Sequence, residues 1–210
     1  MILNYRYYVN NCKNKGGVVS IVDSLISGCK VSYPLPTTLI ISCDNARAMY
    51  HHAQIPRPRM VRPGDLAATF TLKDQSDETF SLLENHERRV LLSFHPLAWT
   101  DKCAAQMLSL EENRETFSSL NTVAVGISVD SVPCKRAWAK SLGITATPLL
   151  CDFWPHGFVS RLYGLFREGN GFSERANVIV DSDQAVVFSK VYPVHSVPDI
   201  SEIIGFLESD

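Results

Sequence analysis

The stretch that decides the fold of this chain reads Phe94-His95-Pro96-Leu97-Ala98-Trp99-Thr100-Asp101-Lys102-Cys103. Residues 90–94 form a short apolar run, which is typical of a strand buried on both faces. Pro96 stops further strand pairing, because proline has no N–H to give to a sheet. A helix is expected to begin near Thr100, which places Cys103 in its first turn. The stretch therefore predicts a strand-to-helix junction with a cysteine at the start of the helix.

A cysteine in the first turn of a helix is a candidate nucleophile. Its thiol lies beside unpaired N–H groups and the positive end of the helix dipole, which favours the reactive thiolate. Making thiolate the main form at neutral pH requires roughly 3.4 kcal/mol, whereas the dipole supplies about 0.3–1 kcal/mol, or about 2 when partly buried. A second positive group is therefore required. Lys102 is adjacent, but neighbouring helical side chains diverge by about 100°, so an arginine from elsewhere in the fold is the better candidate.

The pattern around this junction alternates strands and helices. Cys103, Met107, Leu110 and Phe117 repeat at helical spacing and form one apolar stripe. The other expected elements are a hairpin of residues 69–72 and 79–83, a strand over 122–129, a helix between Ser131 and Gly143, a helical stretch at Phe158, Leu162 and Phe166, a hairpin of 176–180 and 185–191, and a helix after Asp199. This order predicts an α/β protein, with a central mixed sheet flanked by helices and an N-terminal β-hairpin.

Size and composition exclude several classes of function. The chain has 210 residues, of which 45% are hydrophobic and 20% charged, the balance of a globular protein. A net charge of −2 gives no basic excess for a nucleic-acid partner. No stretch approaches the roughly 20 apolar residues of a membrane span, and the first residues lack the pattern of a secretory signal. We therefore expect no membrane or nucleic-acid partner.

The cysteine pattern indicates a reducing, cytoplasmic setting. The irregular spacing of the cysteines is not that of a disulfide framework. No C-x-x-C occurs, which excludes the usual zinc-binding motif and the thioredoxin-type dithiol. We expect no metal site and no cofactor. Cys134 shares a helix face with Trp138 and is expected to pack, and Cys151 is expected in the core or at its rim. The cysteines are Cys12, Cys29, Cys43, Cys103, Cys134 and Cys151.

The chain divides into two unequal parts. Residues 1–59 have no clear period, are broken by prolines, and are expected to be a disordered or loosely attached extension. The tandem His51-His52 in this part reads as solvated surface. Residues 60–210 carry the orderly pattern of the domain, and Met60-Val61-Arg62-Pro63-Gly64-Asp65 looks like its natural beginning.

The motif Pro96-x-x-x-Thr100-x-x-Cys103 resembles the signature of the peroxiredoxins, a family of thiol peroxidases with a thioredoxin-like fold. The resemblance covers about residues 63 to 208 and includes Phe70-Thr71-Leu72, Ser128-Val129-Asp130-Ser131 and Gly171-x-x-x-Arg175. Within the family, the chain looks most similar to the one-cysteine bacterial group that resembles alkyl hydroperoxide reductase E. Three places depart from the family pattern: Ala67-Ala68-Thr69, Ala104, and Gln106 where glutamate is common.

The resemblance implies a role for each residue of the motif. Cys103 would attack the peroxide, Thr100 would bond the thiolate and the peroxide, Pro96 would shield the sulfur, and Arg175 would supply the missing positive charge. The backbone N–H of Cys103 would help to polarise the peroxide. The implied substrates are hydrogen peroxide and organic hydroperoxides. The implied reductant is an external thiol, namely thioredoxin, a glutaredoxin-like protein or a low-molecular-weight thiol, and a homodimer is left open.

Two other functions remain as alternatives. A redox sensor or holdase of the same fold would use Cys103 without turnover, and a thiol–disulfide oxidoreductase is disfavoured by the absence of C-x-x-C. For the peroxidase, position 108 is leucine and no cysteine follows Cys151, so the partners used by two-cysteine relatives are missing. We therefore predict a one-cysteine mechanism. His95, His156 and the aromatic residues 153–154 are expected to serve structure.

Overall fold

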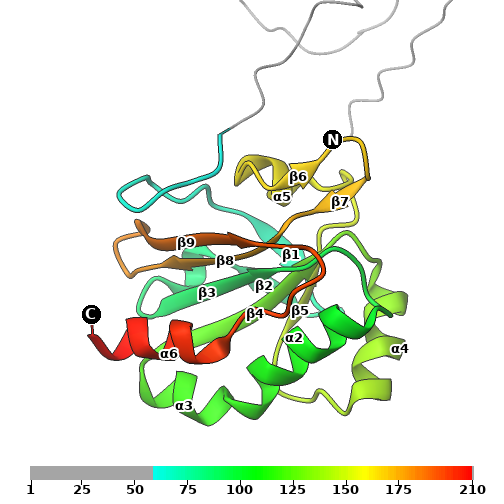
Figure 1. Cartoon of the computed structure of the whole chain (residues 1–210), viewed down its shortest axis with the longest axis horizontal. Coiled ribbons are helices and arrows are strands. Elements are labelled where there is room, and N and C mark those ends of the chain that lie inside the picture. Colours follow the sequence, from blue (N-terminus) through cyan, green and yellow to red (C-terminus); the bar gives the residue numbers. More distant parts are fainter. Residues whose placement is uncertain (1–58, 210) are drawn as a thin grey trace, which may run out of the picture. The chain divides into compact units, whose positions relative to one another are not determined.

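The structure is a computed structural model that describes residues 59–209 (Figure 1). Contacts divide the chain after Pro56, and all described residues belong to the second unit, Arg57–Asp210. The predictions for Cys12, Cys29, Cys43, the tandem His51-His52 and the extension up to residue 58 lie outside the described residues. Among residues 59–209, no helix is long and apolar enough to cross a membrane.

A mixed five-stranded sheet forms the centre of this unit, with strand order β5-β4-β3-β8-β9 (Figure 1). Three strands are parallel: β3 (Arg89–Phe94), β4 (Thr122–Ser128) and β5 (Leu149–Cys151). The hairpin of β8 (Arg175–Val180) and β9 (Val186–Tyr192) adds antiparallel strands beside β3. β3 is thus central, and its residues 90–94 are fully buried, as the apolar run predicts.

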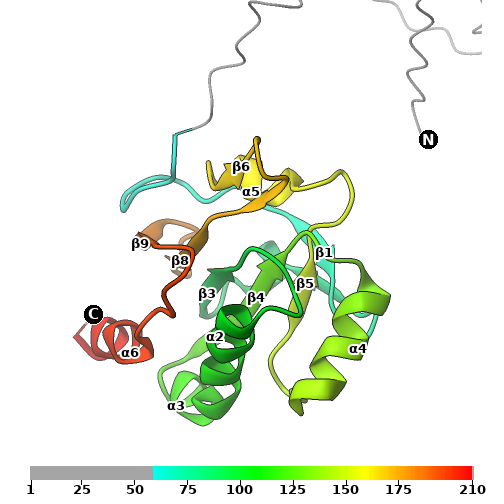
Figure 2. The same cartoon turned by 45° about the vertical axis from the view of Figure 1, so that its right-hand side comes forward.

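Helices cover one face of the sheet (Figures 1 and 2). They are α2 (Asp101–Glu112), α3 (Arg114–Ser119), α4 (Val132–Leu142) and α6 (Ile200–Ser209). The stripe Cys103, Met107, Leu110 and Phe117 joins Trp138, Ile203 and Leu207 in one buried cluster on this face. The apolar spacing of Cys103, Met107, Leu110 and Phe117 therefore gave the correct buried side of α2 and α3.

The opposite face is covered by shorter elements. The predicted hairpin forms from β1 (Thr71–Lys73) and β2 (Thr79–Ser81), and a 3₁₀ helix η1 (Leu83–Asn85) follows it. Helix α5 (Phe158–Leu162) and the small pair β6 (Phe166–Arg167) and β7 (Phe172–Ser173) complete the layer. A second buried cluster joins them to the sheet through Phe70, Leu82, Val159, Tyr163 and alternate strand residues. Both faces of the sheet are thus covered.

Two local predictions differ from the structure. Phe166 was expected on a helix with Phe158 and Leu162, but it lies in β6. The helix ends early because Gly164 takes a positive φ of 67° and packs so closely that an added Cβ would come within 2.3 Å of the Arg59 carbonyl oxygen. Helix α4 has the predicted ends, with Gly143 at φ 72°, but Ser131 makes no side-chain capping bond.

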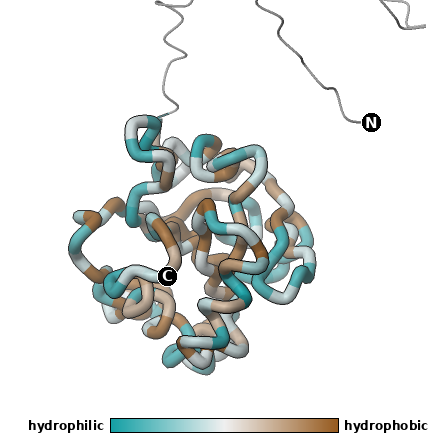
Figure 3. Tube along the Cα trace, turned by 90° about the vertical axis from the view of Figure 1, so that its right-hand side faces the viewer, coloured by the Kyte–Doolittle hydropathy of each residue, from teal (hydrophilic) through white to brown (hydrophobic). Residues whose placement is uncertain are grey.

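Hydropathy follows the layered arrangement. Hydrophilic segments (teal) alternate with hydrophobic ones (brown) along the outer helices in Figure 3, as expected of helices that bury one face. These helices and strands make the thioredoxin-like α/β fold that the sequence predicts. For function, the decisive place is the carboxyl end of β3, where α2 begins.

Candidate active site

Cys103 lies at the junction that the sequence predicts. Thr100 is the residue before α2, and Cys103 is the third residue of the helix, fully buried against its core face. The backbone hydrogen bonds of the helix begin with Ala104, whose N–H donates to the Thr100 carbonyl oxygen four residues earlier, at 2.9 Å. Because the side chain of Thr100 makes no capping bond, it does not occupy the N–H of Cys103. The amide of Cys103 is therefore available to a substrate oxygen.

Arg175 places a guanidinium beside the sulfur of Cys103. It is the first residue of β8, and β8 runs antiparallel to β3, so its beginning lies beside the end of β3 where α2 starts. Arg175 is 1% exposed, and its Nη2 lies 3.4 Å from Cys103 Sγ. Both Nε and Nη2 also donate to the Val194 carbonyl, at 3.1 and 2.8 Å. The sheet topology thus joins residues that are 72 positions apart.

Gln106 holds the other side of this guanidinium. Arg175 Nη1 donates to Gln106 Oε1, and Gln106 Nε2 donates to Ser93 Oγ at 2.7 Å and to the Phe94 carbonyl at 3.2 Å. Ser93 in turn donates to Asn177 Oδ1 at 2.8 Å. All the acceptors in this buried network are neutral. The departure from glutamate at position 106 therefore leaves the arginine without a carboxylate partner in its hydrogen bonds.

Thr100 and Pro96 line the approach to Cys103. A pocket of about 410 Å³ is formed by Pro96, Leu97, Thr100, Asp101, Lys102, Cys103, Phe172, Arg175 and Val194. The Thr100 hydroxyl donates to the Leu97 carbonyl at 3.1 Å, which leaves the oxygen free to accept a bond from a thiol or a hydroperoxide. The structure thus brings Cys103, Thr100, Pro96 and Arg175 together around one pocket. Lys102 is exposed and only its backbone carbonyl approaches Arg175, at 3.5 Å.

Asp130 fixes the loop of residues 96–100. Its Oδ2 accepts a bond from the Ala98 N–H at 2.8 Å and from Ser128 Oγ at 2.6 Å. Trp99, next in the loop, has a φ of 63°, an uncommon conformation for a bulky residue, and is 58% exposed. Ser128 and Asp130 belong to the stretches that resemble the family, but nothing in their spacing points to residue 98, so this contact could not be predicted from the sequence.

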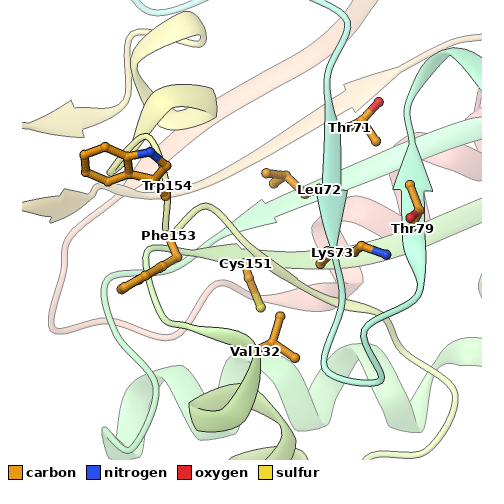
Figure 4. Close-up of a pocket in the computed structure, with 8 residues that line it drawn as sticks. All are labelled: Thr71, Leu72, Lys73, Thr79, Val132, Cys151, Phe153 and Trp154. Carbon is orange, nitrogen blue, oxygen red and sulfur yellow. The ribbon is translucent and has the colours of Figure 1, made fainter. Parts of the chain in front are cut away.

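The other cysteines of the described part do not line the pocket of Cys103. Cys134 packs beside the cluster that contains Trp138, and its Sγ lies 3.7 Å from Asp130 Oδ1. Burial and the nearby Asp130 carboxylate raise the pKa of Cys134. Cys151 faces a different pocket of about 370 Å³, between the β1–β2 hairpin and the start of α4 (Figure 4). Burial raises the pKa of Cys151 to about 11, so it is a neutral thiol.

The two histidines and the loop aromatics were all expected to serve structure, and the structure agrees with this prediction for only some of them. His156 is exposed, bonds the Gly171 carbonyl at 2.7 Å and contacts the Phe166 ring, so its contacts are structural. His95 is fully buried behind the loop. Phe153 and Trp154 were expected to pack, but they are 53% and 81% exposed at the edge of the Cys151 pocket (Figure 4). Among residues 59–209, no group of three or more His, Cys, Asp or Glu could hold a metal ion.

Comparison with known sequences identifies relatives of this arrangement. Residues 63–189 match the model of the AhpC/TSA family. The chain is 36% identical over 141 residues to alkyl hydroperoxide reductase E of Mycobacterium bovis, an overlap of 67% of this chain and 92% of the relative. It is also 30% identical over 151 residues to a peroxiredoxin of Thermoplasma volcanium, covering 70% of this chain and 73% of the relative.

Solved structures share the fold. The crystal structure of reduced 2-Cys peroxiredoxin from Plasmodium vivax gives a TM-score of 0.64 at 24% identity, covering 70% of this chain and 81% of the other. Peroxidoxin BcpB from Mycobacterium tuberculosis gives 0.63 at 23% identity, covering 71% of this chain and 97% of the other. With the family model matching 63–189 and the junction of β3 and α2 carrying the motif, the chain belongs to the AhpC/TSA family of peroxiredoxins.

Proposed function

We propose that this thiol-dependent peroxidase reacts through Cys103 and uses Arg175, Thr100 and Pro96 around it. The observation that carries the proposal is the 3.4 Å contact of Arg175 Nη2 with Cys103 Sγ at the start of α2. A buried guanidinium and the helix dipole both favour thiolate over thiol. Together they supply the stabilisation that the dipole alone lacks.

The reaction breaks one O–O bond and forms one S–O bond. The Cys103 thiolate attacks the nearer peroxide oxygen, and the other oxygen leaves as hydroxide or alkoxide and takes up a proton from solvent, so the products are the sulfenic acid and water or an alcohol. Arg175 and the N–H of Cys103 stabilise the leaving oxyanion, and Thr100 orients the hydroperoxide. Leu97, Phe172 and Val194 give the pocket an apolar wall, which suits the organic part of an alkyl hydroperoxide as well as hydrogen peroxide.

Turnover distinguishes an enzyme from a sensor. The reduced protein is mixed with excess hydrogen peroxide or cumene hydroperoxide and with dithiothreitol, and peroxide loss is followed. An enzyme consumes many equivalents of peroxide for each protein, and turnover stops when dithiothreitol is left out. Consumption of a single equivalent, with reductant still present, would support the sensor or holdase instead.

An external thiol is proposed to reduce the sulfenic acid. The thiol attacks Cys103 sulfur, a mixed disulfide forms, and water leaves. Cys151 faces another pocket and is a neutral thiol, and Cys134 lies on the partly buried side of α4. Peptide mapping after one equivalent of peroxide tests this. A main product linking Cys103 to Cys134 or Cys151 would show a two-cysteine mechanism.

The kind of reductant, the setting and the oligomeric state stay predictions. Thioredoxin, a glutaredoxin-like protein and a low-molecular-weight thiol can each be compared as electron donor in the turnover assay. The cytoplasmic setting rests on the cysteine pattern alone. Sedimentation distinguishes the oligomeric states that the sequence leaves open, since a homodimer has twice the chain mass and a monomer has the chain mass at all concentrations.

A further inference from the structure

Gln106 is a buried polar residue one helical turn after Cys103. It lies on α2 and is 2% exposed. Because residues three positions apart lie on the same face of a helix, its side chain is on the same side of α2 as that of Cys103. Arg175 Nη1 donates to Gln106 Oε1, and Arg175 Nη2 lies 3.4 Å from Cys103 Sγ. A single guanidinium therefore joins the two residues.

The neighbours of Gln106 fix the direction of its amide. Its Nε2 donates to Ser93 Oγ at 2.7 Å and to the Phe94 carbonyl at 3.2 Å, both on β3. A carbonyl oxygen accepts and does not donate, and a guanidinium donates and does not accept. The amide nitrogen of Gln106 therefore faces β3, and its amide oxygen faces Arg175. This position requires a side chain that both donates and accepts.

Ser93 continues the network to the strand that carries Arg175. Its Oγ accepts from Gln106 and donates to Asn177 Oδ1 at 2.8 Å. Ser93 and Asn177 lie opposite each other in the pairing of β3 with β8, and they are 0% and 1% exposed. The hydrogen atoms of Gln106 and Ser93 point in the same direction along this chain, so the bonds reinforce each other. Gln106 is thus held between Arg175 and Asn177, which share a face of β8.

A carboxylate of the same size would not serve this position in the same way. It would accept from Arg175, but it has no N–H for the Phe94 carbonyl. Ser93 could donate to it only by turning its hydroxyl away from Asn177. Its negative charge would also form a buried ion pair with Arg175 and would disfavour a thiolate beside that guanidinium. The neutral amide of Gln106 fits the donors and acceptors around it and leaves the charge of Arg175 uncompensated.

We propose that Gln106 is a positioning residue of the peroxide reaction: its neutral amide, held by β3, fixes Arg175 beside Cys103 without drawing the guanidinium into an ion pair. The inference rests on the proposed reaction of Cys103. Gln106 is not one of the residues that line the pocket of Cys103, so it acts on the sulfur through Arg175. The proposal has two parts, the hold on Arg175 and the neutrality of the amide, and one variant tests each part.

Gln106→Glu tests the neutrality of the amide. The variant keeps the size of the side chain and the acceptor for Arg175, and it adds one negative charge. The ultraviolet titration of the Cys103 thiolate, after subtraction of the signal of Cys103→Ser, is expected to move to higher pH by about one unit. In stopped flow with hydrogen peroxide at neutral pH, the attack is expected to slow about tenfold, the rate equivalent of one unit.

Gln106→Met tests the hold on Arg175. Methionine has a similar length and no charge, but it makes no comparable hydrogen bond to Arg175, Ser93 or the Phe94 carbonyl. The thiolate titration is expected to stay at the wild-type position, because no charge has changed. The rate of peroxide attack is expected to fall about 10- to 100-fold, because the guanidinium is no longer fixed on this side. A change in stability alone would not produce this split between the two variants.

Gln75→Glu is the matched control for the added charge. Gln75 is 9% exposed, and its amide also donates to one backbone carbonyl, that of Thr147, and accepts from one backbone N–H, that of Leu149. It does not line the pocket of Cys103. Gln75→Glu is therefore expected to lower the thermal midpoint, as Gln106→Glu does, but to keep the wild-type titration and the wild-type rate.

The outcomes separate this inference from the proposed function. If the wild type shows no Cys103-dependent reaction with peroxide, the proposed function fails. If the wild type reacts and Gln106→Glu keeps both its titration and its rate, the function stands and the role of the neutral amide is overturned. If Gln106→Met reacts as fast as the wild type, the hold on Arg175 is overturned.

A second measurement needs no variant that folds. NMR of the reduced wild type resolves the side-chain N–H groups of Arg175. Its Nη1 is held by Gln106, and its other contact, the Lys102 carbonyl, is longer, at 3.5 Å. The two protons on Nη1 are expected to give separate signals, because this hydrogen bond stops free rotation of the group. One averaged signal for the two protons would overturn the hold on Arg175.

Discussion

At the scale of single residues, Arg175 brings a permanent positive charge to the sulfur of Cys103. Its hydrogen bonds go to the carbonyls of Val194 and Lys102, the amide of Gln106 and the sulfur of Cys103. None of these partners is a carboxylate. The guanidinium charge is therefore not neutralised by an ion pair, and in the proposed reaction it is free to act on the sulfur and on the oxyanion that forms beside it.

Arg175→Lys tests this use of the guanidinium. A lysine keeps the charge but loses the planar set of donors that reaches Val194, Gln106 and Cys103 together. We expect peroxide attack to slow about 10²-fold, the usual effect of removing one preorganised donor. Stopped-flow rates give the value. Arg114→Lys, at an exposed ion pair on α3, serves as control and should leave the rate unchanged; an equal rate in Arg175→Lys would argue against a directional role.

Thr100→Val tests the hydroxyl without changing the size of the side chain. Because Thr100 makes no capping bond and is exposed, the thermal midpoint should stay close to that of the wild type. The rate of peroxide attack should fall by about 10–100-fold, the effect of losing one hydrogen bond to a charged group, and Thr100→Ser should restore most of it. A valine variant as fast as the wild type would remove Thr100 from the reaction.

Single residues were unequally predictable from the sequence. The spacing of Pro96, Thr100 and Cys103 is local, so it could be read directly. Arg175 was assigned only through the family resemblance, since its approach depends on strand pairing 72 positions away. The contacts of Asp130 and Lys135 were not predicted, because neither a carboxylate that binds a loop nor a buried lysine has a local signature in the sequence.

At the scale of elements, Glu111 near the end of α2 fixes the turn that leads into β5. Its carboxylate accepts bonds from the N–H groups of Thr145, Ala146 and Thr147 and from the hydroxyls of Thr145 and Thr147, at 2.6–3.1 Å for the shortest bond to each. Burial acts to raise the pKa of Glu111, but these bonds outweigh it and lower the pKa to about 2. The helix and the turn are thereby joined far from the reacting sulfur.

Glu111→Gln should destabilise the fold without stopping the chemistry. The lowered pKa corresponds to about 3 kcal/mol of stability, present above the ordinary glutamate pKa of 4.5 and lost as the pH falls towards about 2. Urea unfolding at neutral pH should show a loss of this order in the variant, and the difference should shrink in acid. Glu112→Gln, at the exposed neighbouring position, is the control. Equal stabilities at neutral pH would contradict the account.

Elements with a strong period were predictable, and those set by one close contact were not. The caps of α4 gave its ends within a residue or two. The stripe from Cys103 gave the buried face of α2 but not its end, since the helix breaks at Asn113 and Phe117 lies in α3. Phe166 left the predicted helix because Gly164 must pass against the backbone of Arg59. Contacts of this kind depend on segments that are distant in sequence.

At the scale of the whole molecule, the described unit carries every group of the proposed site. A chain that begins at Met60 should fold and keep the peroxidase rate of the full chain, since the described residues that line the pocket all lie at or after Pro96. A chain from Arg57 is the matched control, because it retains the exposed Arg59–Asp65 ion pair. Such exposed pairs stabilise little. Loss of folding or of rate in both shortened chains would show that the preceding residues are needed.

The general architecture was the most predictable level of all. Alternating strands and helices, two hairpins and a central apolar strand leave few arrangements other than a mixed sheet covered on both faces. The sequence could not give the position of β8 beside β3 from its pattern alone, and this pairing is what brings Arg175 to Cys103.

The most direct test of the account compares the reduced wild type with Cys103→Ser in single turnover and in steady state. With hydrogen peroxide, the wild type should show a rapid change in tryptophan fluorescence, with Trp99 in the active-site loop as reporter. A dimedone trap should mark the Cys103 peptide. Cys103→Ser should keep the fold by circular dichroism but show no fluorescence change, no trapped peptide and no turnover. Retention of more than a few per cent of wild-type turnover by Cys103→Ser would contradict the assignment of Cys103 as the residue that attacks peroxide.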